Sequence, residues 1–166
     1  MPEKSIVSPL VEGGAMLIEE RNLFEGMSPE FMNKVAQCSV SEYRSAGDIL
    51  IRHGDPAQHL YILIEGRIRL SFGEQGYMSF VISNSGDAVG LSSILGREEY
   101  HASAECLVPC LLQKIDKEEL LRIFSKDPAS GLQFYRRLAN LLGQRLVDVY
   151  RLIPAAHGEK HAAPGG

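Results

Sequence analysis

A series of short β-forming runs between residues 38 and 115 constrains the fold of this chain more than any other feature. The runs are separated by turns rich in glycine, aspartate and proline, such as residues 53–56 (HGDP) and 83–87 (SNSGD). Short strands at roughly 8–12-residue intervals, with turn signals between them, are typical of a sandwich or a small barrel. We expect strands at residues 40–43, 49–51, 60–64, 68–70, 80–82 and 107–115.

Helix signals precede this β region. Apolar positions between Ala15 and Phe24 permit a short helix. Ser28 followed by Pro29 is a stronger signal, because serine caps a helix start and proline suits the first helical position. We expect this second helix to extend to about Gln37.

Two more helices are expected after the β region. Asp116, with Glu119 three residues later, forms a capping-box pattern that predicts a helix start. Asp127 followed by Pro128 begins a longer helix by the same combination of cap and proline. Because Pro154 has no backbone N–H to donate, we expect the long helix to end at residue 153.

The chain of 166 residues is long enough for one domain with a core and too short for two of ordinary size. We expect a flexible leader over residues 1–15, helices and the β region over 16–127, the long helix over 128–153 and a disordered tail over 154–166. The tail is rich in Ala, Gly, Pro and His, a composition that buries little apolar surface.

Apolar residues along the long helix recur at heptad spacing, which is typical of a helix that pairs with another helix. These residues are Tyr135, Ala139, Leu142, Leu146, Val149 and Ile153. Two interpretations are open: the helix is buried on its own β region, or it packs there with one face and on a second copy with the other. We favour the second, a homodimer, because a helix of ~26 residues and ~39 Å outreaches a small barrel.

The net charge argues against a nucleic-acid binder. It is −4, whereas affinity for phosphate backbones comes mainly from Lys and Arg. Four arginines do lie close together in the long helix, and we interpret them as a solvated helix face. They are Arg136, Arg137, Arg145 and Arg151.

The composition and the first residues of the chain indicate a cytoplasmic protein. No apolar run reaches the ~18 residues that a membrane span needs, and the first residues do not form a secretory signal. Cys38, Cys106 and Cys110 are an odd number without framework spacing, which suits a reducing compartment. Cys106 and Cys110 would share one face of a strand, and we favour buried cysteines over a metal site there.

Residues 54–70 (GDPAQHLYILIEGRIRL) resemble the cyclic-nucleotide-binding domain family, in particular the sensor half of catabolite-activator and fumarate–nitrate-regulator transcription factors. The matching positions are Gly54, Asp55, Leu60, Tyr61, Gly66, Gly86, Asp87 and Gly90. The similarity covers about residues 21–153. It implies an α+β, mainly β, fold: an antiparallel, double-stranded, jelly-roll-like β-roll with N-terminal helices. It also implies a short phosphate-binding helix and dimerisation through the last helix.

The family's ligand cassette resembles Gly-Glu-x-x-x-Leu followed by Arg-Ser/Thr-Ala, in which the Arg pairs with the cyclic phosphate and the Glu takes the ribose hydroxyl. Here Gly90 matches, but Leu91 stands at the Glu position. Alignment of Ala102 with the family Ala puts Tyr100 at the Arg position and His101 at the Ser/Thr position. Each charge-assisted hydrogen bond contributes roughly 1.5–3 kcal/mol, so both losses predict altered or lost cyclic AMP and GMP binding.

Three features could still hold an anion at the cassette. Arg97 could reach the site if its loop is displaced, Ser92 and Ser93 lie beside the amides near Gly90, and His101 could carry a proton-dependent charge. For His101 we favour an ordinary strand histidine. The ligand therefore stays open between a cyclic nucleotide, another small anion and none. The candidate ligand-binding residues are Gly90, Leu91, Ser92, Ser93, Arg97, Tyr100, His101 and Ala102.

These observations predict a regulatory ligand-sensing domain that acts on a separate effector protein. Only 13 residues follow Ile153, fewer than a helix-turn-helix domain needs, so we expect no direct DNA binding. The chain shows no nucleophile elbow, Walker loop or zinc-protease motif, and we expect no enzyme. A ligand-independent dimerisation or docking module is the first alternative, and a haem or metal sensor using a histidine is the second.

Overall fold

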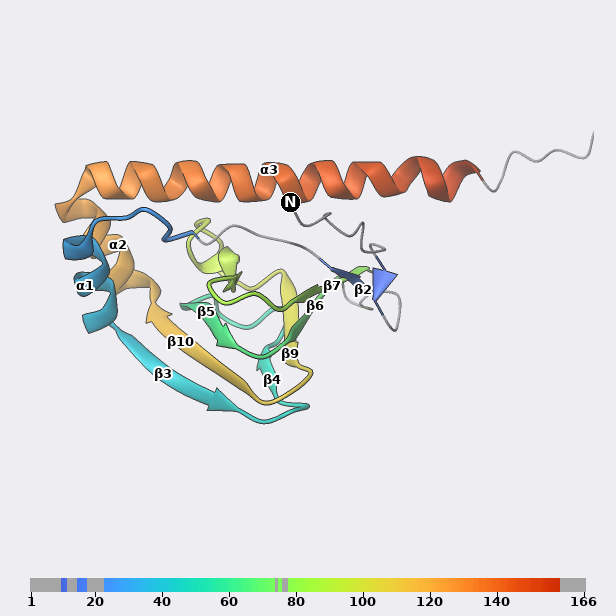
Figure 1. The fold of residues 1–166 in the computed structure, drawn as a ribbon, viewed down its shortest axis with the longest axis horizontal. Helices are drawn as coiled ribbons and strands as arrows, with labels where there is room; N and C mark the ends of the chain where they lie inside the picture. Colours follow the sequence, from blue (N-terminus) through green and yellow to red (C-terminus); the bar gives the residue numbers. More distant parts are fainter. Residues whose placement is uncertain (1–9, 12–14, 18–22, 74, 76–77, 159–166) are drawn as a thin grey trace, which may run out of the picture.

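The computed structural model describes residues 10–11, 15–17, 23–73, 75 and 78–158. Within these residues the chain forms two β-sheets that face each other as a roll, with helices at one end and along one side (Figure 1). The first sheet has the order β1-β2-β7-β6-β9-β4, and the second has the order β3-β10-β5-β8.

The six strands that the turn pattern predicts lie close to their expected positions, whereas the strands over residues 88–89 and 102–106 were not predicted. The first sheet contains β1 (Leu10–Val11), β2 (Ala15–Leu17), β4 (Ile49–Ile51), β6 (Ile68–Phe72), β7 (Met78–Ile82) and β9 (Ala102–Cys106). The second contains β3 (Ser39–Arg44), β5 (His59–Glu65), β8 (Ala88–Val89) and β10 (Cys110–Asp116). All pairs except β2 with β7 are antiparallel, which confirms the predicted fold class.

The start of the chain differs from the prediction. Leu10–Val11 and Ala15–Leu17 form strands, where we expected a leader followed by a helix. Met16 and Leu17 pair in parallel with Phe80 and Val81 of β7. An uncovered sheet edge presents unpaired backbone groups, and a neighbouring segment satisfies them as a strand. The prediction of a helix at Ala15–Leu17 is therefore wrong, and residues 18–22 lie outside the described residues.

The helix starts follow the predicted caps. Helix α1 (Pro29–Gln37) begins after Ser28, whose hydroxyl accepts a hydrogen bond from the Phe31 amide at 3.2 Å. Helix α2 (Lys117–Lys126) begins after Asp116, whose carboxylate accepts from the Glu119 amide at 3.0 Å. Both residues satisfy donors that a helix start leaves open.

Helix α3 (Pro128–Gly158) is longer than predicted. Pro154 removes one helical hydrogen bond, but two alanines, the best helix formers, follow it and the helix ends at Gly158. The predicted end at residue 153 and the start of a disordered tail at 154 are therefore wrong by five residues, while residues 159–166 lie outside the described residues. At about 46 Å, α3 runs along the roll and past its end (Figure 1).

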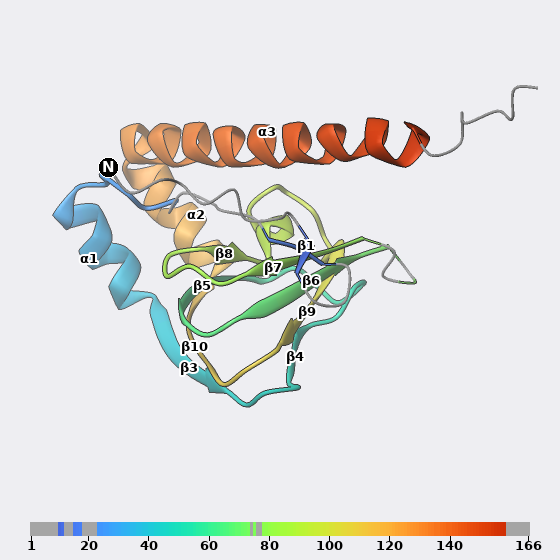
Figure 2. The ribbon, with the colours of Figure 1, turned by 45° about the vertical axis from the view of Figure 1, so that its right-hand side comes forward.

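Two clusters of buried side chains hold these parts together. One fills the roll, and the other lies beneath α1, α2 and α3. In the second cluster, the rings of Phe124 and Phe134 are tilted against each other with centroids 4.9 Å apart, and Phe124 stacks on Phe31 at 6.0 Å. The short 3₁₀ helix η1 (Leu91–Ser93), yellow-green in Figures 1 and 2, lies between the roll and α3. Leu91 of η1 belongs to the second cluster, which fixes η1 beneath α3.

Gly66 allows the first test of this packing. Its φ is +125°, and a Cβ built there would lie 2.9 Å from the Cα of Cys110, whereas Gly47 has φ +86° with nothing within 4 Å. Both alanine variants carry a positive-φ penalty of roughly 1–2 kcal/mol, but only Gly66→Ala also forces the backbones apart, at roughly 1–3 kcal/mol more. We expect urea unfolding to show a clearly larger loss for Gly66→Ala. Equal losses would contradict the close strand packing.

Candidate functional site

A pocket of about 230 Å³ opens between η1, strands β6 and β9 and helix α3. Seven of the eight predicted ligand-binding residues line it: Gly90, Leu91, Ser92, Arg97, Tyr100, His101 and Ala102. The eighth, Ser93, is 1% exposed, and its hydroxyl donates a hydrogen bond to the Gly90 carbonyl at 2.8 Å. Ser93 therefore fixes the turn behind the pocket.

Gly90 brings η1 close to strand β5. Its φ is +85°, and a Cβ at this position would lie 2.9 Å from the carbonyl oxygen of His59 and 3.2 Å from the Tyr100 ring. Only glycine combines this backbone conformation with this approach at low cost. The backbone on one side of the pocket is therefore set by a residue without a side chain.

The family resemblance places a charged residue at two positions of the cassette. At the first of these, this chain has the apolar residue Leu91. The side chain is 8% exposed and belongs to the cluster beneath α3, while its edge lines the pocket. A carboxylate here would be costly to bury without a partner. This position consequently contributes packing to the pocket.

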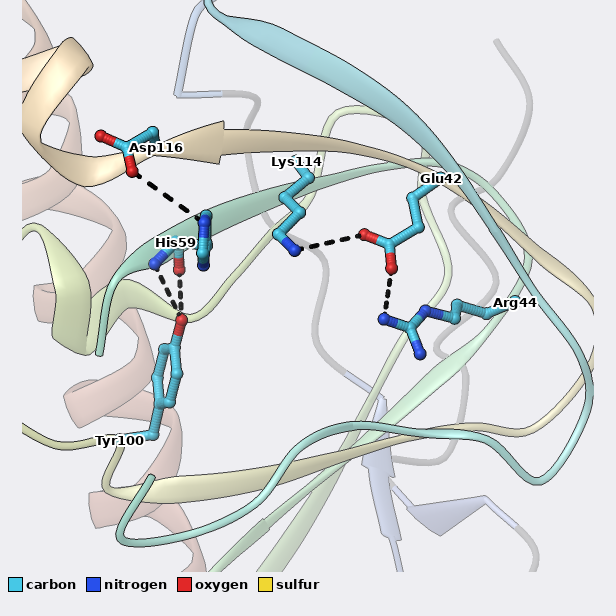
Figure 3. A network of polar contacts seen from close by, with 6 residues as sticks. All are labelled: Glu42, Arg44, His59, Tyr100, Lys114 and Asp116. Carbon is cyan, nitrogen blue, oxygen red and sulfur yellow. Dashed lines mark hydrogen bonds and ion pairs between the residues drawn. The ribbon is translucent and has the colours of Figure 1, made fainter. Parts of the chain in front are cut away.

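Tyr100 occupies the second of those positions, and its hydroxyl is hydrogen-bonded to the backbone of the protein. The hydroxyl oxygen accepts a hydrogen bond from the His59 amide at 3.0 Å, and the hydroxyl donates to the His59 carbonyl at 2.7 Å (Figure 3). Burial raises the pKa of Tyr100 above its ordinary value, so the side chain stays neutral near pH 7. It cannot supply the positive charge of an arginine.

Arg97 and His101 lie on the outer side of the pocket. The Arg97 amide donates to the Ser92 carbonyl at 3.2 Å, which closes the loop after η1, and Arg97 is one of the residues that line the pocket. The His101 amide donates to the Ser92 hydroxyl at 3.2 Å. Arg97 thus reaches the pocket in the observed loop conformation, without the displacement that the sequence suggested.

Helix α3 contributes two lining residues that the sequence analysis did not assign to the site, Leu142 and Arg145. Arg145 was interpreted as part of a solvated face, and this is wrong. It follows the buried Leu138 and Leu141 at helical spacing, so it continues the stripe that faces the roll. That spacing is the signal that could have identified it.

A second pocket, of about 480 Å³, lies between α1 and the second sheet. Its described lining residues include Met32, Ile64 and Gln113 but no charged side chain. The smaller pocket combines cationic, polar and apolar groups. We therefore place the candidate site there.

The cysteines do not form a reactive site. Cys106 ends β9 and Cys110 begins β10, so the expectation that they share one strand is wrong, but both are buried as predicted. Burial raises the pKa of Cys106 to about 12 and keeps it a thiol. In the described ranges, no group of three or more His, Cys, Asp and Glu residues could hold a metal ion, and no helix is long and apolar enough to cross a bilayer.

A sequence model of the cyclic nucleotide-binding domain matches residues 42–127 of this chain. Among curated proteins, cGMP-dependent protein kinase 2 of Mus musculus is 21% identical over 150 residues, which cover 86% of this chain and 19% of the kinase. The chain thus spans about a fifth of that relative's length.

Solved structures share the fold. A putative cyclic nucleotide-binding protein from Geobacter metallireducens GS-15 superposes with a TM-score of 0.65 at 21% identity and covers 75% of this chain and 91% of its own. The catabolite activator protein of Thermus thermophilus gives a TM-score of 0.65 at 24% identity, over 82% of this chain and 63% of its own.

The tether between Tyr100 and His59 can be tested by Tyr100→Phe. Loss of the hydroxyl leaves two backbone groups of His59 without this partner, which costs about 1–3 kcal/mol when such groups are buried. We expect a loss of this size in urea unfolding. Tyr43→Phe, at a tyrosine that is 79% exposed, is the matched control and should change little. A Tyr100→Phe protein as stable as the control would show that the tether contributes nothing.

Proposed function

Because the chain belongs to the cyclic nucleotide-binding domain family, we propose that it is a regulatory domain that senses a small ligand and acts on a separate partner protein. The open pocket between η1 and α3 supports ligand sensing over a docking module, in which side chains would fill this pocket. A ligand there contacts the roll and the long helix at once. Ligand binding can then be transmitted through the helix, provided that the ligand favours one arrangement of it.

The observation that carries the proposal is the replacement of both charged cassette contacts. Leu91 is part of an apolar cluster, and the Tyr100 hydroxyl is engaged by His59. Each missing charge-assisted hydrogen bond corresponds to about one to two decades of affinity. We therefore propose that binding of cyclic AMP and cyclic GMP is weakened or lost, and that the preferred ligand differs from them.

We propose a role without catalysis. Ser92 and His101 both line the pocket, but the contact between them is made by the His101 backbone amide. Activation of a serine nucleophile needs a base side chain within hydrogen-bond reach of the hydroxyl. The geometry favours binding over turnover.

We also propose that two copies pair through α3. Large apolar side chains of the heptad seam are exposed in the single chain, with Tyr135 at 37%, Leu146 at 50% and Ile153 at 47%. Leu142 and Val149, at the inner edge of the same seam, contact the pocket and the roll. A second helix that covered this seam would bury apolar surface that now faces solvent.

Ligand sensing is tested by thermal-shift and calorimetric titration of the full chain with cyclic AMP, cyclic GMP, cyclic di-GMP and small organic anions. A ligand at 100 times its dissociation constant adds about 2.7 kcal/mol of stability. We expect at least one anion of the panel to stabilise the protein more than cyclic AMP or cyclic GMP does at equal concentration. Absence of any shift across the panel would refute ligand sensing, and tight cyclic AMP binding would refute the altered specificity.

Pairing is tested by Leu146→Glu in sedimentation velocity. We expect the parent chain to sediment at twice its mass of 18.3 kDa and the variant at the mass of one copy, because burial of a carboxylate opposes association. Asn140→Glu, at an exposed position of α3 outside the seam, is the matched control and should stay paired. A monomeric parent chain over the accessible concentration range would exclude the pairing.

A further inference from the structure

Two arginines from separate segments line the candidate pocket. Arg97 comes from the loop after η1, and Arg145 comes from the middle of α3. Arg97 makes no ion pair with any residue in the described ranges. The Nη2 atom of Arg145 is shielded from solvent. A shielded guanidinium interacts more strongly with a neighbouring charge than one in bulk water does.

The rest of the lining sets the chemistry of the ligand. Among its described residues there is no Asp or Glu, and the polar side chains besides the arginines are Ser92, His101 and the engaged Tyr100. The other lining residues are apolar, with Leu70, Phe72 and Leu95 among them. Guanidinium groups pair with carboxylates and phosphates in a bidentate geometry. The pocket therefore fits an acidic group joined to an apolar body.

The volume limits the size of that body. At about 230 Å³ the pocket is smaller than the roughly 300–1,000 Å³ typical of sites that enclose drug-sized molecules. An enclosed ligand has to be compact. The roll, η1 and α3 each contribute lining residues, so the ligand contacts all three.

We infer that the pocket binds a compact organic anion, with its acidic group held between Arg97 and Arg145. This inference rests on the proposed sensor function and names its ligand class. Tyr100 stands where the family resemblance places a cationic arginine. Arg145 of α3 then supplies the positive charge instead. Ligand binding thereby fixes α3 against the loop after η1, where the Tyr135 hydroxyl already donates to the Ile94 carbonyl at 3.1 Å.

The test is a calorimetric titration of the full chain with phenyl phosphate, which joins a compact ring to a phosphate. Benzoate carries a carboxylate on the same ring, and comparison of the two identifies the preferred acid. Benzamide is the neutral control, and inorganic phosphate measures the contribution of the acidic group alone. We expect phenyl phosphate or benzoate to bind and benzamide to bind at least tenfold more weakly.

The variants Arg97→Gln and Arg145→Gln assign the contacts. We expect each to weaken binding of the preferred probe about ten- to hundredfold, since each removes a charge-assisted contact. Arg145→Lys keeps the charge without the planar fork and should fall between parent and Arg145→Gln. Arg136→Gln, at an exposed position of α3 outside the pocket, should bind as the parent does.

The outcomes separate this inference from the sensor function. Equal binding by the parent and Arg145→Gln, or by benzamide and the anions, would overturn the anion site while ligand sensing stands. No binding of any of the four probes would also overturn it, and the nucleotide panel then decides ligand sensing independently. The unfolding midpoint of each variant without probe shows whether it is folded. If Arg145→Gln does not fold, Arg145→Lys and Arg97→Gln decide.

Discussion

The arrangement of the whole site depends on the contact between Tyr100 and the backbone of His59. One hydroxyl joins both polar groups of a β5 residue to the start of strand β9, while the bare backbone of Gly90 approaches the same carbonyl. His59 also pairs with Asp116, which caps α2 (Figure 3). His59 thus connects the wall of the pocket, the second sheet and the start of α2. Buried polar groups satisfied in this way hold the backbone in a single arrangement.

Helix α3 combines two faces with different partners. Phe134, Leu138 and Leu141 are buried against the rest of the chain, so docking of the helix does not require a second copy. Leu146 and Ile153 lie on the exposed side. Arg145 stands between these faces and lines the pocket. A helix with this distribution can take part in folding, ligand binding and association at the same time, because each partner meets different side chains.

Local sequence signals predicted most of the fold. Turn residues between β-forming runs located six strands of the roll, and Ser28 and Asp116 located two helix starts, since these features depend on a few neighbouring residues. The strand at Ala15–Leu17 could not be predicted in this way, because it forms against the edge of β7, far along the chain. The spacing of Arg145 from Leu138 and Leu141 predicts the face of α3 on which it lies, but not that a pocket opens beside it. The cassette residues could be named from sequence, but the engagement of the Tyr100 hydroxyl could not.

A tyrosine at position 100, where the family resemblance places an arginine, changes which contacts hold the wall of the pocket together. A buried arginine at this position would need an anionic partner, because an unpaired charge is costly to bury. The hydroxyl of a neutral tyrosine is hydrogen-bonded to His59, so this position needs no anionic partner to be buried. Cations that line the pocket from Arg97 and Arg145 then respond to the ligand without being required for the roll to form. The contact that holds the fold is thereby separate from the cationic groups that we propose to bind the anion.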